Sequence, residues 1–164
     1  MNSIFHRRSV RQFQNKPVEK EKIEQILKAG MNAPTATDDR EWYFWVVEND
    51  TVRRQLSSVT PYAGPAAKAP LDIVIGYRSK AGNAPEYAEI NMAIVSENIM
   101  LEADSLGLGS VMLGIAPHEE RMRKVEEFLQ MPDGISAFTV IPVGYAASEP
   151  ALRDKSIKGR VTWI

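Results

Sequence analysis

The chain has 164 residues, which is enough for one globular domain, so we expect residues 1–164 to fold as a single unit. Its 20 Lys and Arg nearly balance its 21 Asp and Glu, and the formal charge of −1 gives no global attraction to nucleic acid or membranes. The chain has no cysteine and only two histidines, which disfavours disulfide frameworks, thiolate or histidine metal sites and Ser–His catalysis. Its apolar runs are too short for a membrane helix, and no secretory signal is recognisable, which predicts a soluble cytoplasmic protein.

The first half of the chain predicts two helices and two strands. Apolar residues recur at helical spacing over residues 19–31, and residues 43–47 form a β-branched and aromatic run typical of a strand. A short helix is expected over residues 52–59, followed by a loop rich in Pro and Gly over residues 60–70. Residues 71–77 are expected to form the second strand.

The longest predicted helix covers residues 85–106 and is apolar on more than one face. A helix of this kind must be covered nearly all round, and the other elements of so short a chain provide little material for that cover. We therefore expect a partner subunit to supply part of it. Gly107 follows the helix and is expected to form its left-handed cap.

The last part of the chain predicts one more helix and one more strand. A short apolar run covers residues 111–115, a helix begins near Pro117, and residues 137–145 form a β-branched strand. A polar tail then ends in the β-prone residues 161–164, which we expect to pair with another sheet, in the partner subunit. The order of elements indicates a single α+β domain.

The densest functional signal is an N-terminal run of arginines with one hydroxyl: Arg7, Arg8, Ser9 and Arg11. The planar guanidinium fork matches phosphate oxygens, and the serine adds a donor, so this run is suited to a terminal phosphate. Arg153 and Lys155 in the tail would complete an anion cage. The alternative is that both groups are solvated surface charges, which is the usual state of a charge run.

Two further segments bear on ligand binding. Residues 33–42 join a predicted helix to a strand through small and hydroxyl-bearing residues, which let a flat ligand approach the backbone. The glycines of residues 107–114 do not form a dinucleotide-binding fingerprint, because Met112 stands at the third glycine position and the run follows a helix. Gly114 still permits a ring to approach backbone amides.

Taken in order, these segments resemble the nitroreductase family of FMN-dependent oxidoreductases. The resemblance spans nearly the whole chain and rests on an ordered set of motifs: Arg7-Arg8-Ser9-Val10-Arg11-Gln12-Phe13, Ala33-Pro34-Thr35-Ala36-Thr37 leading to Trp42-Tyr43-Phe44, Asn98 and the helix end at 106–110, Leu113-Gly114, Gly144-Tyr145 with Glu149-Pro150, and the basic tail. It implies a three-layer α-β-α sandwich with a central, mostly antiparallel sheet, in a strand-exchanged homodimer that binds FMN between its subunits.

The resemblance also implies roles for particular residues. The phosphate, ribityl and pyrimidine end of FMN would contact Arg7, Arg8, Ser9 and Arg11, and the phosphate would also contact Arg153 and Lys155. The flavin ring would be lined, from the other subunit, by Pro34, Thr35, Ala36 and Thr37, with a further ring contact at Asp38. The redox edge would face Leu113 and Gly114.

The activity implied is hydride transfer from NADH or NADPH to nitroaromatic or quinone-like acceptors in ping-pong order, with no catalytic side chain and no metal. One alternative is an FMN- or nucleotide-binding protein without efficient hydride transfer, and another is an interaction domain whose arginines face solvent. The first alternative is motivated by residues 38–41, where relatives commonly carry Asn and then Gln-Pro before the tryptophan. Asp38 adds a negative charge near an anionic cofactor, which should weaken binding unless Arg40 or another cation compensates.

Overall fold

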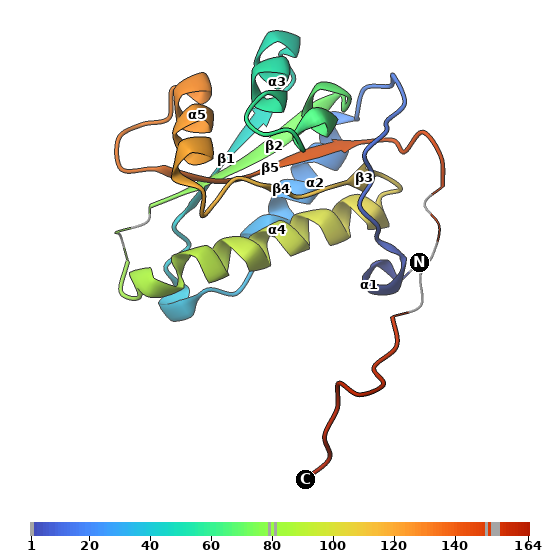
Figure 1. The fold of residues 1–164 in the computed structure, drawn as a ribbon, viewed down its shortest axis with the longest axis vertical. Helices are drawn as coiled ribbons and strands as arrows, with labels where there is room; N and C mark the ends of the chain where they lie inside the picture. The colour runs from blue at the N-terminus through green and yellow to red at the C-terminus, as the bar shows by residue number, and fades with distance from the viewer. Residues whose placement is uncertain (1, 79, 81, 150, 152–154) are drawn as a thin grey trace.

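The strands of the chain form one sheet with helices on both of its faces (Figure 1). The structure is a computed structural model that describes residues 2–78, 80, 82–149, 151 and 155–164. Its strands are β1 (Trp42–Val47), β2 (Leu71–Tyr77), β3 (Gly109–Ser110), β4 (Leu113–Gly114) and β5 (Ser136–Gly144). Its α-helices are α1 (Ser3–His6), α2 (Lys20–Met31), α3 (Asp50–Ser57), α4 (Ala88–Ser105) and α5 (Glu119–Leu129). Short 3-10 helices are η1 (Ala36–Asp38), η2 (Gly64–Ala67) and η3 (Pro85–Tyr87).

The sheet is antiparallel between all of these strands, in the order β1-β2-β5-β3, and β4 also pairs with β5. This confirms the mixed helix and strand composition and the antiparallel sheet expected from the sequence. The second predicted strand matches β2 at both ends, and every residue of β2 is buried.

Two apolar clusters fill the space between the sheet and its helices. Ile73 and Ile75 of β2 lie in the cluster that contains residues of α2 and α4, whereas Val74 lies in the cluster that contains residues of α3 and α5. Successive side chains of a strand point to opposite faces, so a strand covered on both faces must be apolar at nearly every position. This coverage explains why β2 is apolar at every position except Asp72, whose pKa is raised because burial disfavours the charged carboxylate.

The predicted helices are present, with shifts at their ends. The helix expected over residues 19–31 is α2, and the one expected near Pro117 is α5. The helix expected over residues 52–59 begins earlier, at Asp50. The Asn49 side chain accepts a hydrogen bond from the Val52 N–H at 3.1 Å, which caps the first turn.

The long helix α4 ends in the cap that the sequence predicts. Gly107 has a φ of +75°, its N–H donates to the Asp104 carbonyl, and the Leu108 N–H donates to the Ala103 carbonyl. These two hydrogen bonds form a left-handed cap of the kind that favours glycine. Cover of α4 within one chain is partial, because Ile90 on this helix is 56 % exposed.

The structure has a short helix at one end of the chain and an extended tail at the other. Helix α1 was not predicted, and it lies beside the C-terminal end of α4 (Figure 1). Residues 161–164 form no strand within the described chain, and the tail extends away from the body (Figure 1). Pairing of this tail with a second subunit stays a prediction.

Candidate functional site

The arginine-bearing N-terminal segment lies along the edge of the sheet beside β3. Ser9 forms a parallel bridge with Ser110, and the Val10 N–H donates to the Ser110 carbonyl at 2.9 Å. Val10 packs against Gly109, where a Cβ atom would lie only 2.5 Å from a Val10 methyl carbon. A larger residue at position 109 would push the segment off the sheet, so this contact sets where the neighbouring arginines lie.

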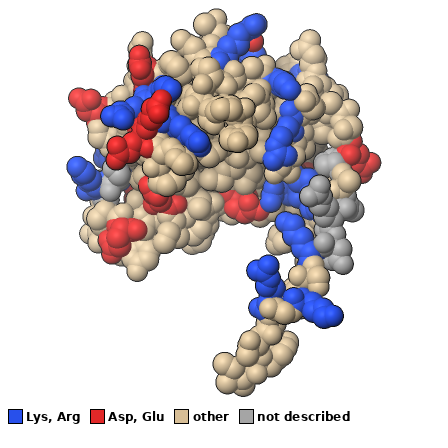
Figure 2. Space-filling model, viewed as in Figure 1, with Lys and Arg blue, Asp and Glu red and all other residues tan. Residues whose placement is uncertain are grey.

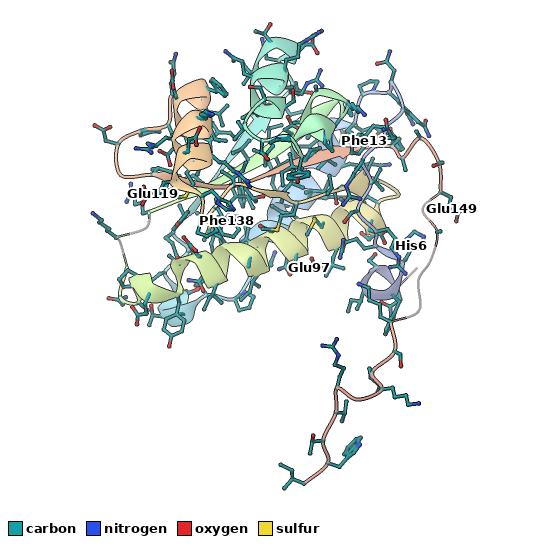
Figure 3. All side chains as sticks on the ribbon, viewed as in Figure 1. His6, Phe13, Glu97, Glu119, Phe138 and Glu149 are labelled. Atoms are coloured by element: carbon teal, nitrogen blue, oxygen red, sulfur yellow. The ribbon has the colours of Figure 1, made fainter. Side chains whose placement is uncertain are left out.

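On one side of this segment, Arg7 and Arg8 line a pocket of about 310 Å³ at the C-terminal end of α4. Arg7 Nε lies 3.2 Å from Glu97 Oε1, and the Arg8 guanidinium donates to the carbonyls of residues 5–7. His6 Nδ1 lies 2.8 Å from Asp104 Oδ1; Figure 3 labels His6 on α1 and Glu97 on α4. Arg7 and Arg8 are half-buried and held by these contacts, so a fully solvated basic patch is the wrong description for this pair.

On the other side of the segment, Arg11, Leu113 and Gly114 line a second pocket, of about 520 Å³. Arg11 is exposed, and its guanidinium makes one long hydrogen bond, of 3.4 Å, to the Ser9 carbonyl. The rest of the lining comes from Thr60, Tyr62, Pro65, Val111, Met112 and Arg121. The structure therefore brings together three residues that the sequence predicts for the cofactor site.

The short strand β4 is held in this pocket by side chains from two other elements. The buried Thr139 hydroxyl of β5 donates to the Leu113 carbonyl at 2.6 Å, and Arg121 Nη1 of α5 donates to the Gly114 carbonyl at 2.8 Å. A Cβ atom at Gly114 would meet only Arg121 Nη1, at 3.9 Å. The backbone of Gly114 is therefore fixed in position while the space beside it stays open.

The predicted ring-lining residues, Pro34 to Asp38, lie elsewhere. The Ala36 N–H donates at 3.2 Å to the side chain of Asn91, near the start of α4, and Asn91 also donates to the buried Glu41 carboxylate at 2.8 Å. Asp104, which contacts His6, is near the other end of α4. At a rise of 1.5 Å per residue, these two points on the helix are about 20 Å apart. Arg7 itself contacts Glu97 at the middle of α4, about 9 Å along the helix from Asn91. Residues 34–38 do not line the pocket that Arg7 and Arg8 line.

The loop that contains residues 36–40 has an unusual backbone. Thr37, Asp38 and Arg40 have φ angles of +55°, +58° and +46°, in the left-handed region that few residues other than glycine adopt. The Arg40 guanidinium pairs with the Asp38 carboxylate at 2.8 and 3.1 Å, which supplies the compensating cation anticipated from the sequence. A hydrogen bond with the Thr37 side chain lowers the pKa of Asp39, and so do the hydrogen bonds that its carboxylate accepts from the N–H groups of residues 83–84.

The structure describes only one of the two tail residues that the sequence predicts to contact the phosphate. Arg153 lies outside the described residues, and Lys155 is exposed. Figure 2 shows Lys and Arg side chains along the tail and on the flank of the body from which the tail leaves. The phosphate contacts expected of Arg153 and Lys155 stay predictions.

A comparison with protein-family models decides the family. The model described as the nitroreductase family matches residues 4–61 and 53–145, which together cover most of the chain. The chain belongs to the nitroreductase family. A relative from Methanothermobacter thermautotrophicus, named as a candidate NADH dehydrogenase/NAD(P)H nitroreductase, is 37 % identical over 154 residues, covering 94 % of this chain and 81 % of its own.

Solved structures give the same family assignment. A structure from Clostridium acetobutylicum, titled a candidate NADH oxidase, has a TM-score of 0.93 and 40 % identity, and the match covers 98 % of this chain and 97 % of that one. A structure titled an FMN-dependent nitroreductase, from Clostridium difficile, has a TM-score of 0.90 and 27 % identity, and the match covers 99 % of this chain and 97 % of that one. The fold of this nitroreductase-family chain thus matches theirs along nearly its full length.

Three residues of the site were missed from the sequence: Tyr62, Arg121 and Thr139. Tyr62 stands in a segment interpreted only as a loop, and Arg121 and Thr139 stand in a predicted helix and strand without a motif around them. Only the pairing of β4 with β5, and the packing of α5 beside β5, bring the last two to Gly114.

The part of the chain that the structure describes lacks two other features. Within it, no group of three or more acidic or histidine residues is placed to hold a metal ion. Over the same residues, no helix is long and apolar enough to cross a membrane.

Proposed function

We propose that this chain is an FMN-dependent oxidoreductase that takes hydride from NADH or NADPH and reduces nitroaromatic or quinone-like acceptors in ping-pong order. In the nitro case, a hydride and one proton from water convert the nitro group to a nitroso group and release a water molecule. Family membership supports the class of chemistry. The observation that carries the proposal is the meeting of Arg11 with Leu113 and Gly114 in one pocket.

The residues present suit FMN by chemistry and by space. A pocket of about 520 Å³ lies within the range of about 300–1,000 Å³ usual for small-molecule sites. Arginine donors suit the phosphate and the electron-rich pyrimidine oxygens of FMN. The open space beside the Gly114 backbone suits a flat ring, because no side chain fills it. We assign FMN binding in this chain to Arg7, Arg8, Ser9, Arg11, Leu113 and Gly114.

When bound, FMN supplies the hydride chemistry, and the protein supplies position and charge. Arg11 places a guanidinium in the pocket, where it stabilises negative charge that develops on a ligand during reduction. Thr139 and Arg121 hold β4 in place through its carbonyls, so its backbone does not need to rearrange when a ligand arrives. This pre-organisation is the main contribution of a rigid site to electrostatic stabilisation.

We further infer that the chain works as a strand-exchanged homodimer, with the sandwich of each subunit completed by its partner. Two features support this: Ile4, Phe5 and Ile90 are exposed apolar side chains, and Trp163 on the extended tail is 91 % exposed. A dimer would also explain why residues 34–38 do not line the pocket of Arg7 and Arg8 within one chain, since a partner's loop would complete the site. Lys155 and Arg153 would then close on the phosphate.

Deleting residues 161–164 tests the dimer. We expect the deleted chain to sediment increasingly as monomer on dilution, at concentrations where the full chain stays dimeric, because the tail residues lose their partner surface. Full-length chain with Thr162→Ala is the matched control, since it keeps the apolar tail residues. An identical dimer–monomer equilibrium for the deleted and full chains would contradict strand exchange.

The proposed activity is tested by anaerobic mixing of the FMN-loaded protein with each nicotinamide. We expect visible flavin absorbance to be lost with NADH or NADPH, and to return when a nitroaromatic or quinone is added. Initial rates measured over both substrates should give the parallel double-reciprocal lines of a ping-pong reaction. A protein that binds FMN but is bleached by neither nicotinamide would favour the alternative, a flavin-binding protein without efficient hydride transfer.

A further inference from the structure

The pocket beside β4 holds two guanidinium groups and, among its described lining residues, no carboxylate. Arg11 reaches it from the N-terminal segment and Arg121 from α5. These positions are 110 residues apart in the chain, and no local motif links them. Two cations that share an acid-free pocket favour an anionic ligand.

The charge of Arg121 is not neutralised by the contact that holds it. Arg121 Nη1 donates to the Gly114 carbonyl at 2.8 Å, which satisfies one of five guanidinium N–H donors and leaves the positive charge in place. Within the described chain, no carboxylate forms an ion pair with Arg121 or Arg11, whereas Arg7 pairs with Glu97 and Arg40 with Asp38. The guanidinium is thus anchored through one nitrogen and retains donors for a ligand.

The other walls of this pocket are flat or apolar. Tyr62 is 81 % exposed and Met112 is 39 % exposed, and both line the pocket with Pro65. An exposed phenol ring offers a face on which an aromatic ring stacks. The pocket therefore combines a surface for a planar apolar body with a cation for a negative group.

We propose that Arg121 is a specificity-determining residue that selects planar aromatic acceptors carrying an anionic group. This inference rests on the proposed function, because it names the acceptor class of the same site. The aromatic ring stacks on the Tyr62 side of the pocket, and the anionic group accepts a charge-assisted hydrogen bond from Arg121. The chemical class is that of nitroarene or quinone carboxylates.

The test compares two acceptors that differ in charge. Para-nitrobenzoate carries a carboxylate, and para-nitrobenzyl alcohol is a neutral analogue of similar size. In Arg121→Met we expect the kcat/KM for the nitrobenzoate to fall about tenfold or more, mostly through KM, because a charge-assisted hydrogen bond is lost. Because Arg121 also holds the Gly114 carbonyl, its loss lowers kcat/KM for both acceptors, so the readout is the ratio of nitrobenzoate to alcohol, which should fall about tenfold. Arg121→Lys should restore part of this preference for the anion.

Arg123→Met is the matched control. It removes the same charge from the same helix, but Arg123 is exposed and does not line the pocket. We expect Arg123→Met to keep the wild-type preference. An equal loss for both acceptors in Arg121→Met, or an equal loss of preference in Arg123→Met, would overturn the proposal.

Binding provides a readout that does not depend on turnover. Calorimetry of benzoate with the FMN-loaded protein should show about tenfold weaker binding in Arg121→Met than in the wild type. If wild-type protein turns over neither acceptor, the proposed function fails, and benzoate binding still decides whether Arg121 holds an anion. If Arg121→Met instead lowers FMN affinity, or lowers the rate of reduction by NADPH relative to NADH, the guanidinium serves a cofactor phosphate and the acceptor proposal is wrong.

Discussion

The short strands β3 and β4 pair with the same long strand, β5, yet one of them is closed by packing and the other borders open space. In β3, Gly109 lies against Val10 with no room for a Cβ atom, and both residues of the strand are buried. In β4, Gly114 is exposed, and a Cβ atom there would meet only the guanidinium of Arg121, at an ordinary contact distance.

The difference shows that a glycine in a short strand serves two purposes in this chain. At β3 it allows close approach of the segment that bears the arginines, and so it acts on the fold. At β4 it keeps the backbone accessible to a ligand, and so it acts on the site. Both glycines pair with β5, Gly109 with Gly144 and Gly114 with Thr139, which makes them a natural pair for mutation.

The largest expected effect is on FMN affinity, through the arginines of the segment that packs against β3. Arg7→Ala should weaken FMN binding by roughly 1.5–3 kcal/mol, because a charge-assisted phosphate contact is lost. The measurement is a titration of apoprotein with FMN, in which quenching of the flavin fluorescence reports binding. Glu97→Gln is the matched control, since it removes the partner of Arg7 and leaves the guanidinium available for phosphate. Unchanged FMN affinity in Arg7→Ala would place the phosphate away from this residue.

The next effect is on stability, at β3. Gly109→Ala should lower the free energy of unfolding by about 1–3 kcal/mol, because the added methyl group overlaps Val10 and the segment must move. Urea denaturation of the apoprotein measures it. Gly109→Ala combined with Val10→Ala should recover part of the loss by clearing the space. A Gly109→Ala chain as stable as the wild type would mean that the segment yields easily, and the contact would not set the positions of the arginines.

The smallest effect on stability is expected at β4. Gly114→Ala should change the free energy of unfolding by less than about 0.5 kcal/mol, because the new methyl group meets open space. The same change should slow flavin reduction by NADH or NADPH, since the methyl group occupies space that we assign to the ring. Urea denaturation and anaerobic reduction of the same preparation measure both. Equal reduction rates for Gly114→Ala and wild type would show that the flavin ring does not lie beside Gly114.

The sequence predicts the fold well wherever the signal is local. The mostly apolar segment Leu71–Tyr77 predicts β2 at both ends, and Gly107 predicts the cap of α4. The helix expected over residues 52–59 begins earlier, at Asp50, because the Asn49 side chain caps its first turn. Helix α1 was missed because four residues are too few to show a helical period.

The candidate site was predicted less completely, because its parts come from distant places in the chain. The arginine run indicates Arg11, the glycine run indicates Gly114 and the family resemblance adds Leu113, and the structure places the three in one pocket. Arg121 has no motif around it, and only the packing of α5 brings it to the Gly114 carbonyl. Residues 34–38 lie by the start of α4 and do not line the pocket that Arg7 and Arg8 line, so no pattern within one chain shows what they would contact.

The most direct test of the account is a crystal structure of the protein grown with FMN. We expect FMN with Arg11 at its pyrimidine side, the Leu113–Gly114 backbone along its ring and Arg7 near its phosphate. FMN found in another part of the molecule, with the Arg7 and Arg11 side chains turned to solvent, would contradict it.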